Sequence, residues 1–514
     1  MIPFSNQSYI DFSNPDNVKK QKEALSMVES QFGREYPNII GGKEIFSDKK
    51  TKSLDPSDTS KIVGIFQKSG ADQAELAINT AYETFQWWRN FPADERAKYL
   101  FKAAELIRKR RYEINAWMIK EVGKNYAEAD GDVSEGVDFL EYYGREMLRY
   151  MKGGEIPSMA GEFSEYFYIP LGVGIIIPPW NFPFAIMAGM TAAAIVTGNT
   201  VVLKPSSDSP MMAYLFARIM QEVGLPDGVL NLLVASGSEA GDYLVDHPKT
   251  RFISFTGSVD VGKRIYERAS KVQPGQIWLK RVIAEMGGKD TLIIDSETSD
   301  LDQAVNMTIT SAFGFQGQKC SACSRVVVDD KIYDQFLEKL IKATAALPIG
   351  EPSDNYRIGP VVSASAEKTI LEYIEIAKKE GKIVLGGEKL NRPGYFIQPT
   401  IVTDIAPDSR ISQEEIFGPV LAVLKAKDFD EALAIANNTQ YGLTGGVCTI
   451  NREKMIKAKR DFNVGNLYFN RKITGAMVGS HPFGGFNMSG TDSKTGSPDY
   501  LLLYLQGKAV SELL

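Results

Sequence analysis

The spacing of hydrophobic residues changes after the first third of the chain. In that first part, apolar residues recur every three or four positions along two stretches, which predicts two amphipathic helices. The first helix carries its apolar stripe from Ala74 to Trp88, and the second begins near Asp94 and continues through Ile114. Residues 1–60 are polar and show neither helical nor strand periodicity, so we expect them to be irregular.

Further along, short apolar runs alternate with helical patterns. Buried strands separated by helices are typical of parallel sheets with crossover connections. A first group predicts an α/β unit of the dinucleotide-binding type, with strands at residues 172–177, 200–203, 230–234 and 252–255. A second group predicts another α/β unit, with strands at residues 291–294, 326–328, 383–385, 420–424 and 467–469.

Two segments fit neither unit. Residues 151–170 are punctuated by glycine and proline and are expected to form a long hairpin, and residues 500–514 end the chain with an apolar run. A projecting hairpin and an apolar tail indicate an oligomerisation arm, so a homo-oligomer, a dimer or an assembly of dimers, is expected. The predicted domains are a cofactor domain of residues 1–150 and 171–281, a catalytic domain of residues 282–485, and an arm of residues 151–170 and 486–514.

The composition is that of a globular protein of two or three domains. The chain has 514 residues, of which 44% are hydrophobic and 24% are charged. Its net charge of −6 and the absence of a basic stripe argue against a nucleic-acid partner. The most apolar stretch, residues 185–203, contains Gly189, Gly198 and Asn199, so it predicts a buried helix and strand and no membrane span.

Cysteine and histidine are scarce. An odd count of three cysteines argues against a disulfide framework and for a reducing compartment. The first residues lack the basic and apolar regions of a secretory signal, so a cytoplasmic location is expected. With only two histidines and no spaced ligand motif, no metal site is expected.

Two glycine loops follow predicted strands, at residues 237–241 and 257–263. The second nearly matches a P-loop, but Arg264 stands where a Ser or Thr would bind Mg²⁺, which disfavours a nucleotide hydrolase. A helix that begins near Ser258 can still hold a phosphate at its positive end. Ordinary turn glycines explain these loops equally well.

A different kind of pattern surrounds Cys320, in the segment GFQGQKCSACSR at residues 314–325. The cysteine lies in a glycine-rich turn, and Lys319 and Arg325 are close to it in sequence. Cationic surroundings stabilise the thiolate, which is the reactive form of the thiol. The alternative is a buried and inert cysteine.

Three further motifs accompany this cysteine. The segment PPWNFP at residues 178–183 offers the amide of Asn181, which can donate to a developing oxyanion. The segment EMGGK at residues 285–289 supplies the carboxylate of Glu285, which can act as a base where histidine is scarce. The segment EEIFGP at residues 414–419 adds another acid beside an aromatic residue.

These four motifs, in this order, resemble those of the aldehyde dehydrogenase superfamily, and the resemblance extends from about residue 60 to 500. It implies an α/β fold with a Rossmann-type cofactor domain, a second α/β catalytic domain and a small oligomerisation arm. It also implies that Cys320 attacks the aldehyde, that Asn181 and the Cys320 N–H stabilise the oxyanion, and that Glu285 activates water. Cys323 and Cys448 are expected to be structural.

The resemblance further implies NAD as the cofactor. It places Lys204 near the adenine ribose, Ser258 at the pyrophosphate, and Glu415 with Phe417 at the nicotinamide ribose. A serine at position 207, where many NAD-specific members have a glutamate, would not repel a 2′-phosphate, so NADP is expected to be accepted as well. The remaining residues expected at the cofactor are Ile177, Pro178, Trp180, Gly237, Gly241, Phe255 and Gly287.

For the substrate, residues 474–490 and 278–285 resemble the 1-pyrroline-5-carboxylate dehydrogenase group of this family. That group oxidises glutamate γ-semialdehyde to glutamate in proline and arginine catabolism. The backbone N–H groups of Gly475 and Ala476, with the hydroxyl of Ser321, can hold the substrate carboxylate.

Three other side chains complete this expected substrate site. Phe182 and Phe483 would pack against the methylene chain, and Glu135 would orient polar groups nearby. A glycine-rich turn without amino-acid selectivity is the alternative interpretation of residues 474–490.

Three alternative functions stay open at this point. The chain could act on another aldehyde, such as a fatty, betaine or succinic semialdehyde. It could be a cysteine hydrolase that pairs Cys320 with His481. It could also be a binding protein that kept the fold and lost the activity, although the presence of Cys320, Asn181 and Glu285 argues against this.

Overall fold

The computed structural model describes residues 3–157 and 159–514. Its first sheet has seven strands in the order β11-β10-β7-β8-β9-β2-β3, parallel from β11 to β9. The two short N-terminal strands β2 and β3 extend this sheet in antiparallel fashion. The strands are β2 (Asn38–Ile40), β3 (Lys43–Ile45), β7 (Val173–Ile177), β8 (Thr200–Leu203), β9 (Leu230–Leu232), β10 (Thr250–Thr256) and β11 (Arg281–Glu285).

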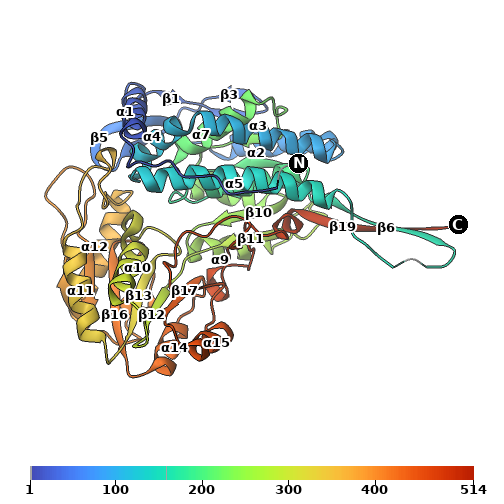
Figure 1. Ribbon diagram of the computed structural model, residues 1–514. Coiled ribbons are helices and arrows are strands. Elements are labelled where there is room, and N and C mark those ends of the chain that lie inside the picture. Colours follow the sequence, from blue (N-terminus) through green and yellow to red (C-terminus); the bar gives the residue numbers. More distant parts are fainter. Residues whose placement is uncertain (1–2, 158) are drawn as a thin grey trace.

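Helices cover this sheet and connect its strands (Figure 1). The connections after β7, β8, β9 and β10 are α6 (Ala185–Val196), α7 (Pro210–Glu222), α8 (Asp242–Asp246) and α9 (Val259–Ala269). The N-terminal part adds α1 (Pro15–Glu29), α2 (Ala71–Trp88), α3 (Ala93–Lys109), α4 (Arg111–Val122) and α5 (Tyr126–Tyr150). Among the described helices, none is both long and apolar enough to cross a bilayer.

The second sheet also has seven strands, in the order β14-β15-β16-β13-β12-β17-β18, and only β14 is antiparallel. Its strands are β12 (Asp290–Ile294), β13 (Cys323–Asp329), β14 (Lys382–Leu385), β15 (Thr400–Thr403), β16 (Val420–Ala426), β17 (Thr444–Cys448) and β18 (Asn466–Phe469). Its helices are α10 (Leu301–Phe313), α11 (Tyr333–Ala345), α12 (Ala364–Glu380), α13 (Arg410–Gln413), α14 (Phe429–Asn437) and α15 (Arg452–Asp461).

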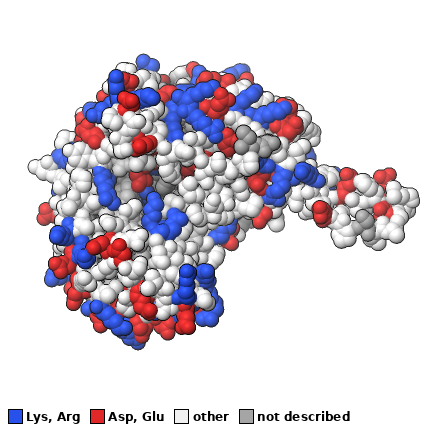
Figure 2. All heavy atoms as spheres, viewed as in Figure 1, with Lys and Arg blue, Asp and Glu red and all other residues white. Residues whose placement is uncertain are grey.

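The arm is made by two distant segments. β6 (Glu162–Pro170) pairs in antiparallel register with β19 (Leu505–Leu513), and together they project from the body (Figure 1). The expectation of a hairpin within residues 151–170 is therefore wrong, because β6 finds its backbone partner in the C-terminal tail. Figure 2 shows the same projection, with acidic and basic side chains interspersed over the visible face of the body.

The expected strands of both α/β units are present, but the N-terminal part differs from the expectation. The segment from residue 3 to residue 67 is not irregular: it contains α1, β2, β3 and a small sheet of β1 (Glu35–Tyr36), β4 (Lys50–Asp55) and β5 (Asp58–Gln67). The second expected helix is broken at Arg110, whose φ of −99° and ψ of 14° separate α3 from α4. Non-local packing supplied the order that local periodicity did not reveal. The domain boundaries stay a prediction.

Candidate active site

At the candidate site, the loops at the ends of the strands of the two sheets come together. The parallel strands β7, β8, β10 and β11 direct their carboxyl ends to the same edge, which is where open α/β sheets bind ligands. From the second sheet come the segments that precede β13 and β16. The residues that follow the first set of strands, and those that precede the second set, therefore meet in one place.

Cys320 lies where two cavities meet and contributes to the lining of both. It follows a tight turn in which Phe315 and Gln316 have left-handed backbone angles, with φ of 48° and 54°. Gly288 makes room for this turn, because a Cβ built there would lie 2.7 Å from the Cys320 carbonyl oxygen. Two glycine-rich segments thus bring the cysteine next to the end of β11.

The electrostatic surroundings of Cys320 are acidic and not cationic. Lys319 lies 2.7 Å from Glu128 in an ion pair, and Arg325 is buried in β13, where it donates to the Ala436 carbonyl at 3.0 Å. The expectation that these cations stabilise the thiolate is wrong, because neighbouring residues along a turn or strand point in different directions. Burial raises the pKa of the Cys320 thiol, and the nearby carboxylates of Asp290 and Glu415 raise it further.

Asn181 lies in the loop that follows β7 and lines the larger cavity together with Cys320. Its side chain is 4% exposed, and its Nδ2 donates to the Gln318 carbonyl at 3.1 Å. This bond ties the amide to the turn that carries the cysteine. An amide held in this way is preorganised as a donor beside the sulfur.

Glu285 is the last residue of β11 and lines the smaller cavity with Cys320. Its Oε1 accepts hydrogen bonds from the Ser493 hydroxyl and from the Ser493 N–H, the latter at 3.3 Å. Its Oε2 is buried and has no hydrogen-bond partner among the described residues. Burial raises the pKa of Glu285 to about 7, so this carboxylate can accept a proton near neutral pH.

The larger cavity, which we call the cofactor cleft, has a volume of about 770 Å³. It is lined by all of the predicted cofactor residues except two: Ile177, Pro178, Trp180, Lys204, Ser207, Phe255, Ser258, Gly287, Glu415 and Phe417. Gly237 and Gly241 are not on its wall. Gly241 lies behind Lys204, since a Cβ built there would be 3.6 Å from the lysine Cε.

The cofactor cleft presents groups suited to a dinucleotide. Lys204 is buried, and its one hydrogen bond within the described part of the chain, to the Pro205 carbonyl, is long at 3.4 Å, so its ammonium is available for hydroxyl groups of a ribose. Ser258 precedes α9 and makes no side-chain capping bond among the described residues, which leaves the N-terminus of the helix free for a phosphate. Glu415 accepts from the Gly288 N–H at 3.0 Å.

The sequence did not reveal part of this cleft. Ser363, Ser365 and Thr369 line it from the start of α12, and Asp208 stands beside Ser207. The residues around α12 lie more than 150 positions from Lys204 in the chain. No local pattern marks them, because their place in the cleft depends on how the second sheet packs against the first.

The smaller cavity, which we call the substrate pocket, has a volume of about 90 Å³. All six predicted substrate residues line it: Glu135, Phe182, Ser321, Gly475, Ala476 and Phe483. Residues that the sequence did not single out add mostly apolar and hydroxyl groups: Phe139, Ile186, Met190, Thr256, Thr495 and Tyr500. The Lys124 ammonium, which is ion-paired with Asp132 of α5, lies 4.0 Å from the Phe182 ring centroid.

The remaining cysteines and His481 lie outside both cavities. Cys323 and Cys448 are buried in β13 and β17, as expected for structural residues. His481 accepts from the Met477 N–H at 3.1 Å through Nδ1 and lies beside Arg471. It does not line the pocket that contains Cys320, so a hydrolase that pairs these two residues lacks its base.

The site places a cysteine between a dinucleotide-sized cleft and a small pocket with a buried carboxylate. This arrangement is that of a dehydrogenase that uses a cysteine nucleophile. Residues 45–510 match the aldehyde dehydrogenase family. The chain therefore belongs to the aldehyde dehydrogenase family, and the expected fold is confirmed.

More specific likenesses cover the whole chain. It is 55% identical over 99% of both chains to a 1-pyrroline-5-carboxylate dehydrogenase of Geobacillus sp. (strain WCH70), and equally identical to that of Bacillus cytotoxicus over both full lengths. A solved 1-pyrroline-5-carboxylate dehydrogenase from Thermus with bound NAD is 49% identical, with a TM-score of 0.99 over the full length of both chains.

Proposed function

We propose that this chain oxidises L-glutamate γ-semialdehyde, the open form of 1-pyrroline-5-carboxylate, to L-glutamate with reduction of NAD. The observation that carries the proposal is the position of Cys320, on the shared wall of the cofactor cleft and of a pocket lined by the six residues predicted to bind the substrate. The full-length relatives named 1-pyrroline-5-carboxylate dehydrogenase support it. The NAD bound in the Thermus relative supports the cofactor.

The first half of the reaction forms a thioester. The Cys320 sulfur bonds to the aldehyde carbon, and the thiol proton is released to solvent as this bond forms, because burial raises the pKa of the thiol. The Asn181 amide and the Cys320 N–H donate to the resulting oxyanion. Bound NAD supplies the acceptor for the hydride that leaves this carbon. The oxyanion then collapses to the thioester carbonyl.

The second half releases the acid. A water molecule attacks the thioester carbon while the Glu285 carboxylate takes its proton, and the carbon–sulfur bond breaks to regenerate Cys320. The Oε2 of Glu285 has no hydrogen-bond partner among the described residues and can take this proton, while the Ser493 hydroxyl donates to Oε1. In total, one aldehyde, one water and one NAD⁺ give one carboxylate, one NADH and two protons.

The substrate pocket suits a short chain with a polar end. The left-handed φ of 75° at Gly475 turns the backbone, and N–H groups exposed in such a turn bind carboxylates without an arginine. Phe182 and Phe483 provide apolar walls for the methylene groups. A cavity of only about 90 Å³ disfavours long fatty aldehydes.

We also propose that the chain accepts NADP, that it forms a homo-oligomer and that it is located in the cytoplasm. Ser207 brings no charge to the cofactor cleft, which favours acceptance of NADP, although Asp208 stands next to it. The arm exposes Phe163 (51%) and Leu513 (84%), apolar side chains that a partner subunit would cover. Three free cysteines fit a reducing compartment such as the cytoplasm.

The test is a spectrophotometric assay of NADH formation with 1-pyrroline-5-carboxylate, succinic semialdehyde and propanal, each with NAD and with NADP. We expect the highest kcat/KM with 1-pyrroline-5-carboxylate. Faster turnover of another aldehyde would retain the chemistry and refute the substrate. No turnover of any aldehyde would refute the proposed reaction. A monomer observed by native mass spectrometry of the dilute protein would refute the proposed homo-oligomer.

A further inference from the structure

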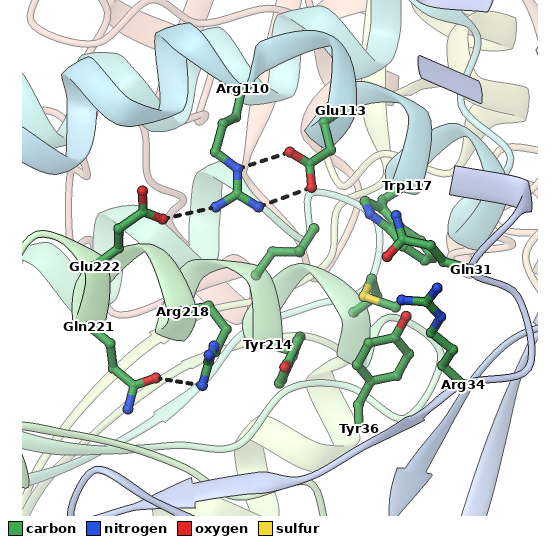
Figure 3. A pocket seen from close by; sticks show the side chains of 12 residues that line it. Gln31, Arg34, Tyr36, Arg110, Glu113, Trp117, Tyr214, Arg218, Gln221 and Glu222 are labelled. Carbon is green, nitrogen blue, oxygen red and sulfur yellow. Dashed lines mark hydrogen bonds and ion pairs between the residues drawn. The ribbon is translucent and has the colours of Figure 1, made fainter. Parts of the chain in front are cut away.

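A second large cavity lies away from Cys320, between the end of α1, β1, α4 and α7 (Figure 3). Its volume is about 680 Å³, and it shares no lining residue with the cofactor cleft or the substrate pocket. The proposed reaction therefore gives this cavity no role. We call it the α4–α7 cavity.

Aromatic rings form much of its wall. Tyr36 and Tyr214 lie with ring centroids 4.9 Å apart, and Trp117 meets Tyr36 edge-on at 6.3 Å. Trp117 is only 1% exposed, so packing around it fixes the orientation of its ring. Rigid aromatic walls of this kind suit a flat apolar group, which can stack on them or pack against their edges.

Two hydrogen-bond donors at this wall have no partner among the residues that the structure describes. Tyr36 is only 8% exposed. Its hydroxyl is buried and makes no hydrogen bond within the part of the chain that the structure describes. Such groups are rare in folded proteins and call for a missing partner. The structure gives the Arg34 guanidinium no hydrogen bond or ion pair with any described side chain, and Figure 3 shows it pointing into the cavity beside the Tyr36 hydroxyl.

The other charges in the cavity are already compensated. Arg110 binds Glu113 through two contacts of 2.9 and 3.0 Å and also contacts Glu222 at 3.4 Å (Figure 3). Arg218 lies 3.2 Å from Glu44. Arg34 is therefore the lining cation without a side-chain partner among the described residues, and its guanidinium lies close to an unused hydroxyl donor.

We propose that the α4–α7 cavity binds a small oxyanion that carries a flat apolar ring. The guanidinium of Arg34 and the hydroxyl of Tyr36 donate to the oxyanion, since a guanidinium fork matches carboxylate and phosphate oxygens. The ring lies against Trp117 and Tyr214. The loop from Lys204 to Ser209 lines the cofactor cleft and leads directly into α7, so the ligand would contact the helix that follows this loop.

Isothermal titration calorimetry of the intact protein tests this proposal with four probes. Two carry a ring and an oxyanion, 4-hydroxyphenylacetate as a carboxylate and AMP as a phosphate. Phenol has the ring alone, and inorganic phosphate has the anion alone. We expect at least one ring-bearing anion to bind with a Kd below about 1 mM, and its identity distinguishes a carboxylate ligand from a phosphate ligand.

Variants locate the binding. Arg34→Gln removes an exposed side chain without disturbing the core, and it should weaken binding at least about tenfold, the usual effect of losing a hydrogen bond to a charged group. Tyr36→Phe should weaken it about fivefold. Arg89→Gln, an exposed arginine at the end of α2 outside the cavity, is the control and should change nothing. AMP binding should also persist when the cofactor cleft is saturated with NAD.

Three outcomes overturn the proposal. They are no binding by either ring-bearing anion, an unchanged Kd in Arg34→Gln, and binding of phenol or phosphate as tight as that of the ring-bearing anions. The result does not depend on the proposed function, because the titrations contain no aldehyde and the variants lie outside the site at Cys320.

Discussion

The cofactor cleft and the substrate pocket meet at Cys320 but are built differently. The cleft is about 770 Å³ and takes its walls from both sheets, with polar contacts spread along its length. The pocket is about 90 Å³ and is lined largely by aromatic rings, together with Gly475 and Ala476. A dispersed cleft tolerates the loss of one contact, whereas a small closed pocket makes selectivity depend on single side chains.

The largest expected effect is at the point the two cavities share. Cys320→Ala removes the nucleophile and should lower kcat by at least about 10,000-fold with every aldehyde and either cofactor. Cys323→Ala, three residues away in the core, should keep the activity and lose only stability. Steady-state rates measure both variants, and a Cys320→Ala enzyme with substantial activity would contradict the thioester mechanism.

The next effect concerns Glu285, which touches only the substrate pocket. Glu285→Gln should lower steady-state kcat about 100-fold, as loss of a general base does, while a first turnover of NADH still appears as a burst. The wild-type rate should rise with pH through about 7, because burial raises the pKa of Glu285 to about 7 and only the carboxylate accepts a proton. Stopped-flow absorbance and a pH profile check both, and the loss of the burst would argue that Glu285 acts earlier.

A smaller effect should separate selectivity from chemistry. Ser321→Ala removes a proposed donor to the substrate carboxylate and should lower kcat/KM for 1-pyrroline-5-carboxylate about tenfold, with propanal unaffected. Ser324→Ala is the matched control, because Ser324 lines neither the cofactor cleft nor the substrate pocket. Equal losses for both aldehydes would mean that Ser321 supports the cysteine turn and does not recognise substrate.

The smallest effect is expected in the cofactor cleft. Ser207→Glu should lower kcat/KM for NADP about fivefold, which is about 1 kcal/mol of like-charge repulsion at the surface, and leave NAD unchanged. Asp208→Asn should shift the preference in the opposite direction. Competing assays with the two cofactors measure the ratio, and a ratio that neither variant changes would place the 2′-phosphate elsewhere.

Much of the fold could be predicted from periodicity. The strands at residues 200–203 and 420–424 follow from short buried apolar runs, which need no distant information. The strand pairing within the arm could not be predicted in the same way. β6 carries no sign that its partner is β19, more than 300 residues away, because the periodicity of one strand does not identify a distant partner strand.

The same division runs through the candidate site. The sequence by itself determined the four motifs. These include Gly288 and Gly287, whose lack of a side chain lets Cys320 and Glu415 approach the backbone, because such contacts depend on residue type and local backbone. Only the tertiary structure decided that Lys319 turns away to Glu128 and that carboxylates surround the thiol. Charge neighbours in space are set by the packing of one sheet edge against the other, and adjacency along the chain does not encode them.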